Sequence, residues 1–264
     1  MQPTGEAAWA AGSVPSTMLG LPPSVTGCLF DLDGVLTRTA AVHASAWKTM
    51  FDEFLRDWSA RTGQPFVPFD AVVDYDRFVD GRRREDGARA FLASRGITVP
   101  EGGDSDPAGS ATLRGLARRK NDLVLHLLAT HGVEVYEGSV RYVRAAREHG
   151  LRRAVVSSSA NTAQVLDAAG IADLFEARID GLVAEERHLA GKPAPDMFLA
   201  GADAVGLAPA GAAVFEDALA GVQAGRDGGF GLVVGVDRVG QSAELYRHGA
   251  HIVVSDLSEL LDRA

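Results

Sequence analysis

Short apolar runs that end at polar residues recur along the chain. The first, 25–30, stops at Asp31-Leu32-Asp33-Gly34, and similar runs cover 154–156, 212–215, 232–234 and 252–254. Such runs are typical of buried strands, and polar residues at their ends are typical of the carboxyl edge of a parallel sheet. Segments of helical character lie between them at 138–149, 161–169, 195–205, 218–227 and 241–248. The alternation predicts an α/β fold with a Rossmann-like parallel sheet.

Residues 41–132 follow a different pattern. They contain helical stretches at 43–59, 85–95 and 112–131, and a polar loop at 97–110 that is dense in Gly, Pro and Asp. This segment predicts a helical cap inserted after the first strand, over the sheet edge where open α/β sheets bind ligands. The predicted division is a poorly ordered leader at 1–20, a catalytic core at 21–40 and 133–264, and the cap at 41–132.

Composition narrows the possible partners and compartments. The chain has 264 residues, 46% of them hydrophobic, and 26 Lys and Arg against 35 Asp and Glu, a net charge of −9. This acidic balance, with no basic stripe, argues against nucleic acid and against an anionic membrane surface. The single cysteine, Cys28, excludes an internal disulfide and fits a reducing compartment. Without a long apolar run or a secretory signal, we expect a cytoplasmic protein.

The acidic pair at the end of the first apolar run is the first candidate for chemistry. Asp31 and Asp33 can face one cleft, where one carboxylate could attack an electrophile while the other moves a proton. A loop opener or helix cap explains the pair equally well. A calcium loop does not, because it requires glycine at the sixth position and an acid at the twelfth, where this chain has Gly34 fourth and Val42 twelfth.

Polar residues at the ends of the later predicted strands favour a chemical role for the acidic pair over a structural one. Glu216-Asp217 supplies hard oxygen ligands suited to Mg²⁺, Ser157 can hold a phosphate, and Lys192 is a cation enclosed by prolines before a helix. Separately, each has an ordinary explanation as a cap, a turn or a surface charge. Together, a nucleophile, a metal site, an anion site and a cation at one sheet edge predict Mg²⁺-dependent phosphoryl transfer.

In this order the same residues resemble the four motifs of the haloacid dehalogenase superfamily, over nearly the whole chain after about residue 25. Within the superfamily the chain is most similar to the β-phosphoglucomutase group. That similarity lies in Thr39, His43, Ala46-Trp47-Lys48, Arg84-Glu85-Asp86, Arg119-Lys120-Asn121-Asp122, Ser157-Ser158-Ser159-Ala160-Asn161 and Phe215-Glu216-Asp217-Ala218-Leu219-Ala220-Gly221. The resemblance implies the fold of that superfamily, a helical cap and a sugar-phosphate substrate.

The resemblance also implies a role for each matching residue of the core. Asp31 becomes the nucleophile that forms an aspartyl phosphate, and Asp33 the general acid and base. Glu216 and Asp217 complete the Mg²⁺ site, which also includes Asp31 and the backbone carbonyl of Asp33. The residues that bind the transferring phosphate or the substrate are Lys192, Ser157, Ser158 and Asn161.

Around the cap, the resemblance places Thr39 at the hinge and His43 beside the acid and base. Arg84 is expected to grip the non-reacting phosphate, and Lys120 to reach the sugar. From the residues alone, His43 could equally be a packing residue and the 82–84 arginine run a solvated face. Trp47, Phe51 and Phe54 have helical spacing that favours a role in the cap interior.

Three features depart from the family pattern. Arg38 stands where members commonly carry Asp, Ala160 stands where a lysine can touch phosphate, and the 97–110 loop lengthens the insert. The first two favour the alternative of a Mg²⁺-dependent sugar-phosphate phosphatase. A sugar-phosphate sensor on an inactive fold is a third possibility, which the intact acids and Lys192 argue against, and dehalogenation does not need the second acidic loop.

The leading hypothesis is a monomeric phosphoglucomutase that interconverts β-D-glucose 1-phosphate and glucose 6-phosphate through a 1,6-bisphosphate. Arg84 and Lys120 favour it over the phosphatase, because a gripped sugar hydroxyl can reach an effective molarity of about 10⁵–10⁸ M and so compete with water.

Overall fold

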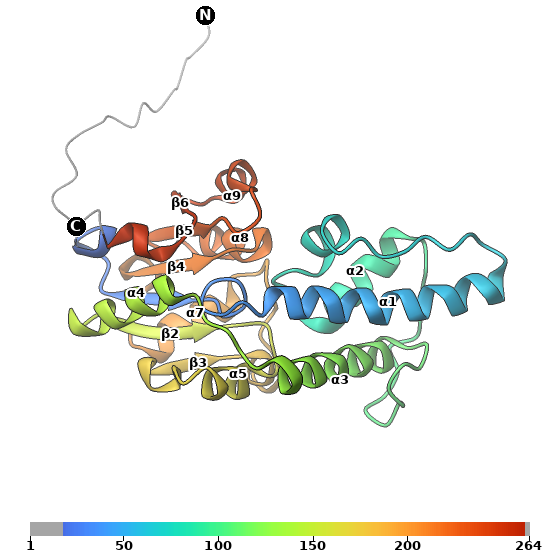
Figure 1. The fold of residues 1–264 in the computed structure, drawn as a ribbon. Coiled ribbons are helices and arrows are strands. Elements are labelled where there is room, and N and C mark those ends of the chain that lie inside the picture. Colours follow the sequence, from blue (N-terminus) through green and yellow to red (C-terminus); the bar gives the residue numbers. More distant parts are fainter. Residues whose placement is uncertain (1–17, 262–264) are drawn as a thin grey trace, which may run out of the picture.

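The computed structural model describes residues 18–261 of the chain. Within them lies a six-stranded sheet in which every neighbouring pair is parallel, in the order β3-β2-β1-β4-β5-β6 (Figure 1). The strands are β1 (Gly27–Phe30), β2 (Arg152–Val156), β3 (Ala177–Ile179), β4 (Ala212–Glu216), β5 (Leu232–Val236) and β6 (Ile252–Val254). The chain runs outward in both directions from β1, which makes the ends of β1, β2 and β4 the place where such sheets bind ligands. The predicted parallel α/β fold is confirmed.

Helices cover both faces of this sheet. Cys28 and Phe30 of β1 point to one face and Leu29 to the other, as the twofold period of a strand requires. The first face is covered by α4 (Glu137–Glu148) and α5 (Thr162–Ala168), together with η1 (Met18–Gly20), η3 (Ala172–Leu174) and η5 (Leu257–Leu260). The other face is covered by α6 (Gly181–Glu186), α7 (Asp196–Ala204), α8 (Leu219–Asp227) and α9 (Ser242–His248), and the turn η4 (Pro209–Gly211) precedes β4.

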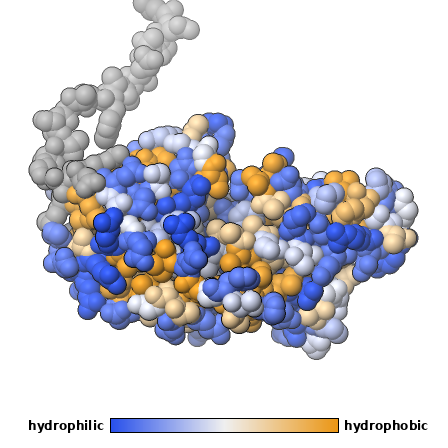
Figure 2. Space-filling view, viewed as in Figure 1, coloured by the Kyte–Doolittle hydropathy of each residue, from blue (hydrophilic) through white to orange (hydrophobic). Residues whose placement is uncertain are grey.

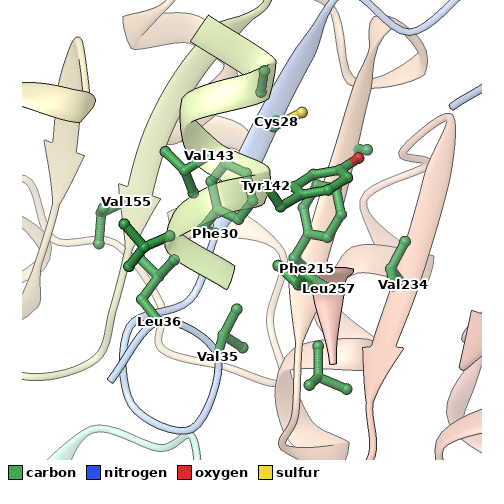
Figure 3. Close-up of a cluster of buried hydrophobic side chains, with 14 of the residues drawn as sticks. Cys28, Phe30, Val35, Leu36, Tyr142, Val143, Val155, Phe215, Val234 and Leu257 are labelled. Carbon is green, nitrogen blue, oxygen red and sulfur yellow. The ribbon is translucent and has the colours of Figure 1, made fainter. Parts of the chain in front are cut away.

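Aromatic rings fill the centre of the α4 side (Figure 3). The rings of Phe30 and Phe215 stack with centroids 4.6 Å apart, and Tyr142 of α4 packs 5.3 Å from Phe215. The Tyr142 hydroxyl donates a hydrogen bond of 2.9 Å to the Leu19 carbonyl, and the Leu19 side chain is buried. The prediction of a poorly ordered leader over 1–20 is therefore wrong for residues 18–20, which pack on the core. Residues 1–17 of that leader lie outside the described residues. Burial raises the pKa of Cys28, which agrees with an inert thiol.

The inserted segment has its own hydrophobic interior. It comprises α1 (Ala40–Thr62), the π-helix η2 (Tyr75–Val79), α2 (Arg84–Ser94) and α3 (Leu113–His131), which lie beyond one end of the sheet (Figure 1). Trp47, Phe51 and Phe54 are buried there, Trp47 and Phe51 with stacked rings 5.1 Å apart, so their predicted place in the cap interior is confirmed. The exact division of the chain at 40/41 and 132/133 stays a prediction.

Two linkers join this segment to the core side by side. Thr37 and Val135 form an antiparallel bridge. The amide of Arg38 donates to the Glu134 carbonyl at 2.8 Å, and the amide of Tyr136 donates to the Leu36 carbonyl at 2.9 Å. The entering and leaving chains therefore form a small ladder, which confines relative movement of the two parts to a hinge.

The surface mixes hydrophilic and hydrophobic residues on the core and the cap alike, with the hydrophobic ones in separate groups on the face shown in Figure 2. Large apolar residues exposed singly are normal on a folded protein. Among the described residues, no helix is both long enough and apolar enough to cross a membrane.

Candidate active site

Three neighbouring strands end at the same level on the carboxyl edge of the sheet. Phe30, the last residue of β1, is in register with Val155 of β2 and with Phe215 of β4. Asp31 follows β1 directly, and Glu216 is the last residue of β4. The hydrogen-bonded register therefore gathers Glu216 and the residues that directly follow the strands, Asp31, Ser157 and Asp217, and all four are buried.

Lys192 is the buried cation at this edge. Its Nζ lies 2.5 Å from Oδ1 of Asp31 and 2.7 Å from Oε1 of Glu216, and donates to the Val156 carbonyl at 3.1 Å. Burial alone would lower the pKa of Lys192, but attraction to the two carboxylates outweighs it and raises that pKa. A permanently charged ammonium is thus fixed against Asp31, where it can also attract a phosphoryl oxygen.

The acids here outnumber the cation. Asp31, Glu216 and Asp217 each offer a carboxylate oxygen within 4.8 Å of the others. Burial raises the pKa of Asp31 to about 6 and that of Glu216 to about 7, although Lys192 opposes both shifts. Burial, followed by repulsion from Asp80 and Glu216, raises the pKa of Asp217 well above its ordinary value. Clustered hard oxygens with excess negative charge make these three residues able to hold a metal cation.

A second chain of polar groups leads from Asp33 into the cap. The hydroxyl of Thr39 donates to the Asp33 carboxylate, and Nε2 of His43 lies 3.4 Å from Asp33 Oδ1 without forming a hydrogen bond to it. Nδ1 of His43 lies 2.8 Å from Nζ of Lys120. Burial, then the nearby Lys120 and Arg84 charges, lowers the pKa of His43 well below its usual value. A neutral His43 that accepts from Lys120 carries its ring proton on Nε2, facing Asp33.

Burial raises the pKa of Asp33, and the hydroxyl of Thr39 opposes that shift. A carboxyl group that holds a proton closer to neutral pH is suited to general acid and base work. Asp33 also lies on the wall of the same small cavity as Asp31. The two acids therefore have separate surroundings: Asp31 faces Lys192, and Asp33 faces Thr39 and His43.

The cap contributes the other cations. Arg84 is the first residue of α2, and its Nη1 donates to the Ala117 carbonyl of α3 at 3.4 Å. Burial lowers the pKa of Arg84, and burial together with the Arg84 charge lowers that of Lys120 to about 7. Both side chains line the cavity that Asp31 and Asp33 also line. Arg84 is partly buried, Lys120 is buried, and the two cations repel each other. A bound anion would reduce that repulsion, so the pair can serve as an anion site.

The part of the cleft between core and cap that holds these groups is narrow, although a neighbouring cavity of about 560 Å³ on the same boundary shares Tyr75, Asp80 and Asp217 with it. The cavity that contains these groups has a volume of about 50 Å³, far below the several hundred Å³ of a site for a small organic ligand. Two hydrogen bonds cross it: the Ser158 hydroxyl donates to the Gly81 carbonyl at 2.7 Å, and Asn161 Nδ2 donates to Asn121 Oδ1 at 3.0 Å. A sugar phosphate can enter only after the cap moves away and these contacts open.

The sequence reasoning missed two residues at this site. Asp80 and Tyr75 of the cap line the cavity together with Asp217. Burial, then repulsion from Glu216, raises the pKa of Asp80 to about 8. The signal that could have revealed Asp80 is the Asp-Gly pair immediately before the arginine run that contains Arg84.

The departures from the family pattern lie in different places. Arg38 is at the hinge, with its guanidinium 4.4 Å from the centre of the Tyr136 ring, and its side chain is 55% exposed. Ala160 lies on the loop after β2, between Ser159 and Asn161, and brings no charge there. In the 97–110 loop the Asp106 carboxylate accepts from the Thr112 hydroxyl at 2.6 Å. The loop is therefore tied to the start of α3, away from the strand ends.

A parallel sheet with a buried lysine and clustered carboxylates at its carboxyl edge, under a helical cap, defines an α/β enzyme of group transfer. The chain matches the family model of haloacid dehalogenase-like hydrolases over residues 25–229. It is 54% identical over 251 residues to a protein named β-phosphoglucomutase from Mycobacterium bovis, covering 94% of this chain and 96% of the relative. The chain belongs to the haloacid dehalogenase-like hydrolases and, within them, to the β-phosphoglucomutase-like proteins.

Solved structures share the fold. A hydrolase from Pseudomonas syringae superposes with a TM-score of 0.72 at 22% identity, covering 90% of this chain and 96% of that structure. A β-phosphoglucomutase from Clostridium difficile gives 0.69 at 22% identity, covering 89% and 93%. At this identity the likeness concerns the fold.

Proposed function

We propose that this protein is a phosphoglucomutase that interconverts β-D-glucose 1-phosphate and glucose 6-phosphate. The observation that carries the proposal is the position of Asp31, which is fixed by Lys192 at 2.5 Å and shares one small cavity with Arg84 and Lys120. A nucleophile on one wall and two cations on the other suit a substrate with a phosphate at each end. The relative at 54% identity, named β-phosphoglucomutase, supports the same assignment.

We assign the metal site to Mg²⁺, held by Asp31, Glu216, Asp217 and the backbone carbonyl of Asp33. The residues present fit this ion, because three buried carboxylates offer oxygens within 4.8 Å of one another, while Lys192 pairs with Asp31 and Glu216. When bound, the ion would neutralise the clustered carboxylates and the phosphoryl oxygens, so that carboxylate and phosphate could approach each other.

Asp31 and Asp33 divide the chemistry between them. In the forward direction, the C6 hydroxyl of β-glucose 1-phosphate attacks phosphorus in phosphorylated Asp31, its proton passes to Asp33, and the aspartyl P–O bond breaks. The resulting 1,6-bisphosphate turns round in the cleft. A carboxylate oxygen of Asp31 then attacks phosphorus of the C1 phosphate, and Asp33 returns the proton to the departing C1 oxygen. The raised pKa of Asp33 suits both duties.

The remaining residues position the substrate. Lys192 and Ser157 hold the transferring phosphate, while Arg84 grips the phosphate that does not react and Lys120 reaches the sugar. On the core side, Ser158 and Asn161 now bond to the cap, so we assign them to closing the site over the substrate. A cap that closes over the bound sugar would limit the access of bulk water to phosphorylated Asp31 and so favour transfer to the sugar. A monomeric state and a cytoplasmic location stay predictions.

The decisive experiment separates transfer to sugar from transfer to water. Purified protein is incubated with β-glucose 1-phosphate, Mg²⁺ and a trace of β-glucose 1,6-bisphosphate, and glucose 6-phosphate and free phosphate are measured in parallel. We expect glucose 6-phosphate, with phosphate release slower by orders of magnitude, and little product from α-glucose 1-phosphate, which differs only at C1. Phosphate release at a comparable rate would instead establish the sugar-phosphate phosphatase, which the uncharged Ala160 beside the phosphate loop favours.

A further inference from the structure

Arg238, on the loop between β5 and α9, reaches across the core to the loop that follows Asp33. Its Nε donates to the Gly34 carbonyl at 2.8 Å and its Nη2 to the Val35 carbonyl at 3.3 Å. The side chain is only 13% exposed. The two carbonyls come from consecutive residues, directly after the acid and base. One guanidinium therefore holds two consecutive carbonyls of this loop.

The same guanidinium is anchored on its other side. Nη1 donates to the Ser255 carbonyl at 2.6 Å and lies 3.5 Å from the Asp256 carboxylate. Nη2 also lies 3.4 Å from the Ser139 hydroxyl of α4. Ser139 is buried, and Ser255 and Asp256 follow directly after β6, so Arg238 links the Gly34–Val35 carbonyls to α4 and to the end of the sheet. A planar guanidinium with five N–H groups can bind this many partners at once, whereas a lysine cannot.

The loop that Arg238 holds is also the meeting point of the catalytic acids and the hinge. Gly34 has φ +90°, and a Cβ there would collide with the carboxylate of Asp217. The amide of Gly34 donates to the Thr37 carbonyl at 2.8 Å, and Thr37 bridges to Val135 of the second linker. A small displacement of this loop therefore moves Asp33 relative to Asp217 and to the cap.

A stack of side chains extends the connection to the second linker. The Arg238 guanidinium lies 3.5 Å from the centre of the Tyr136 ring, and that of Arg38 lies 4.4 Å from the same ring. Tyr136 immediately precedes α4, where the chain leaves the cap, and Arg38 lies where the chain enters it. One aromatic ring thus joins both linkers to Arg238.

We propose that Arg238 is a positioning residue for the reaction: it holds the Gly34–Val35 carbonyls so that Asp33 keeps its place when the hinge moves. The inference rests on the proposed function, because it assigns Asp33 the proton transfer. Loss of Arg238 leaves Asp31 and Lys192, which other elements hold, in position. It therefore impairs the step that needs the Asp33 proton more than the phosphorylation of Asp31, which uses only the backbone carbonyl of Asp33 as a proposed metal ligand and is compared at saturating Mg²⁺.

Acetyl phosphate provides that comparison. Asp31 attacks its phosphorus and the P–O bond to acetate breaks, and acetate leaves as an anion that needs no proton from Asp33. For Arg238→Gln at saturating Mg²⁺ we expect kcat for sugar phosphate to fall about 10²-fold with KM changed little, because a displacement of about 1 Å costs that much. We expect the rate of phosphoenzyme formation from acetyl phosphate, followed by intact-protein mass spectrometry, to stay within about threefold of wild type.

Three further variants sharpen the test. Arg238→Lys keeps the charge and fewer contacts, and should recover part of kcat. Tyr136→Phe keeps the ring and should match wild type, as should Arg247→Gln, which removes an exposed arginine of α9 that pairs with Glu244. The inference is overturned if Arg238→Gln has wild-type kcat, or if both reactions fall together in a variant that melts at the wild-type temperature.

If Arg238→Gln does not fold, Arg238→Lys decides by the same two rates. A wild-type kcat in Arg238→Lys, or equal losses in the two reactions, overturns the inference. Failure of the proposed function is distinct, because it is seen in the wild-type protein as free phosphate in place of glucose 6-phosphate.

Discussion

The two walls of the narrow cleft differ in charge. The core wall presents Asp31, Glu216 and Asp217 around one cation, Lys192. The cap wall presents Arg84 and Lys120, with Asp80 as its acidic exception. Burial disfavours the charged groups of each wall. It raises the pKa of Asp31 and Glu216 on the core wall and lowers that of Lys120 on the cap wall. In the proposed function a metal cation would relieve the first wall and a phosphate anion the second, so the two walls suit different ligands.

The walls also differ in how they are held. Parallel strands in register fix the core groups, because β1 pairs with β2 and with β4. The cap groups rest on a separate hydrophobic cluster, and two side-chain hydrogen bonds from Ser158 and Asn161 join it to the core across the cleft. Breaking these contacts costs little compared with unfolding either part. The groups proposed for the chemistry therefore lie on the sheet, whereas those proposed for recognition lie on the cap, which few polar contacts join to the core across the cleft.

The largest expected effect comes from the core wall. Asp31→Asn removes the nucleophile and should lower kcat by about 10⁴-fold or more, because an amide cannot form the aspartyl phosphate. The cap cations remain, so binding of glucose 6-phosphate measured by calorimetry should persist. An active Asp31→Asn protein, with mass spectrometry excluding deamidation back to Asp, would place the nucleophile elsewhere and end the contrast between the walls.

Substitutions on the cap wall should lower kcat/KM for the sugar phosphate. Arg84→Gln and Lys120→Met each remove a charged contact to substrate, which is worth about 10- to 100-fold in kcat/KM. Phosphorylation of Asp31 by acetyl phosphate should be unaffected, since that donor has no remote group to grip. Arg119→Gln is the matched control, because Arg119 is the neighbour of Lys120 and pairs with Glu53 at the surface. If acetyl phosphate and sugar phosphate reactions declined equally, the cap residues would act on the chemistry itself.

The core wall could be predicted from the sequence for a physical reason. Buried parallel strands are continuous apolar runs, and parallel strands deliver the residues that follow them to one edge. Asp31, Ser157 and Glu216 were found by this rule alone, and the structure places them together. The edge strand β3 was not found, because Ala177–Ile179 is three residues long and has Arg178 at its centre. Such a strand has no apolar run to detect.

The cap wall was less accessible to the same reasoning. Asp80 follows a π-helix, Tyr75–Val79, for which single-sequence periodicity has no signature. Its approach to Asp217 depends on how the cap closes, which is a tertiary property. Arg238 is similar, since its partners Gly34 and Val35 are about 200 positions away along the chain. Residues that act through distant contacts have to be seen in the fold.

A smaller effect is expected from substitution of Asp80, the acidic residue of the cap wall. When ionised, Asp80 helps to raise the pKa of Asp217 and adds to the negative field that attracts a cation; because its own pKa is raised to about 8, the effect is measured above that pH. Asp80→Asn should therefore raise the Mg²⁺ concentration for half-maximal activity by about 3- to 10-fold, the size of one partly screened charge interaction. Asp57→Asn is the control, since Asp57 is an exposed acid of the cap that does not line the cavity with Asp31. An unchanged Mg²⁺ requirement in Asp80→Asn would confine metal binding to the core wall.

The smallest effect is on stability and needs no substrate. Without a divalent cation, the folded-state pKa values of Asp31 and Glu216, about 6 and about 7, lie above their ordinary values. The folded protein therefore binds protons that the unfolded chain has already released, and stability from these groups falls as pH rises from about 4 through about 7.

In EDTA we expect the melting temperature to decline between about pH 5 and pH 8, by a few degrees. Mg²⁺ should raise it more at the higher pH, where the carboxylates are charged, and Glu216→Gln should flatten the decline. A melting temperature in EDTA that rises over this interval would mean that His43 and Lys120, whose lowered pKa values make stability rise with pH, outweigh the core acids.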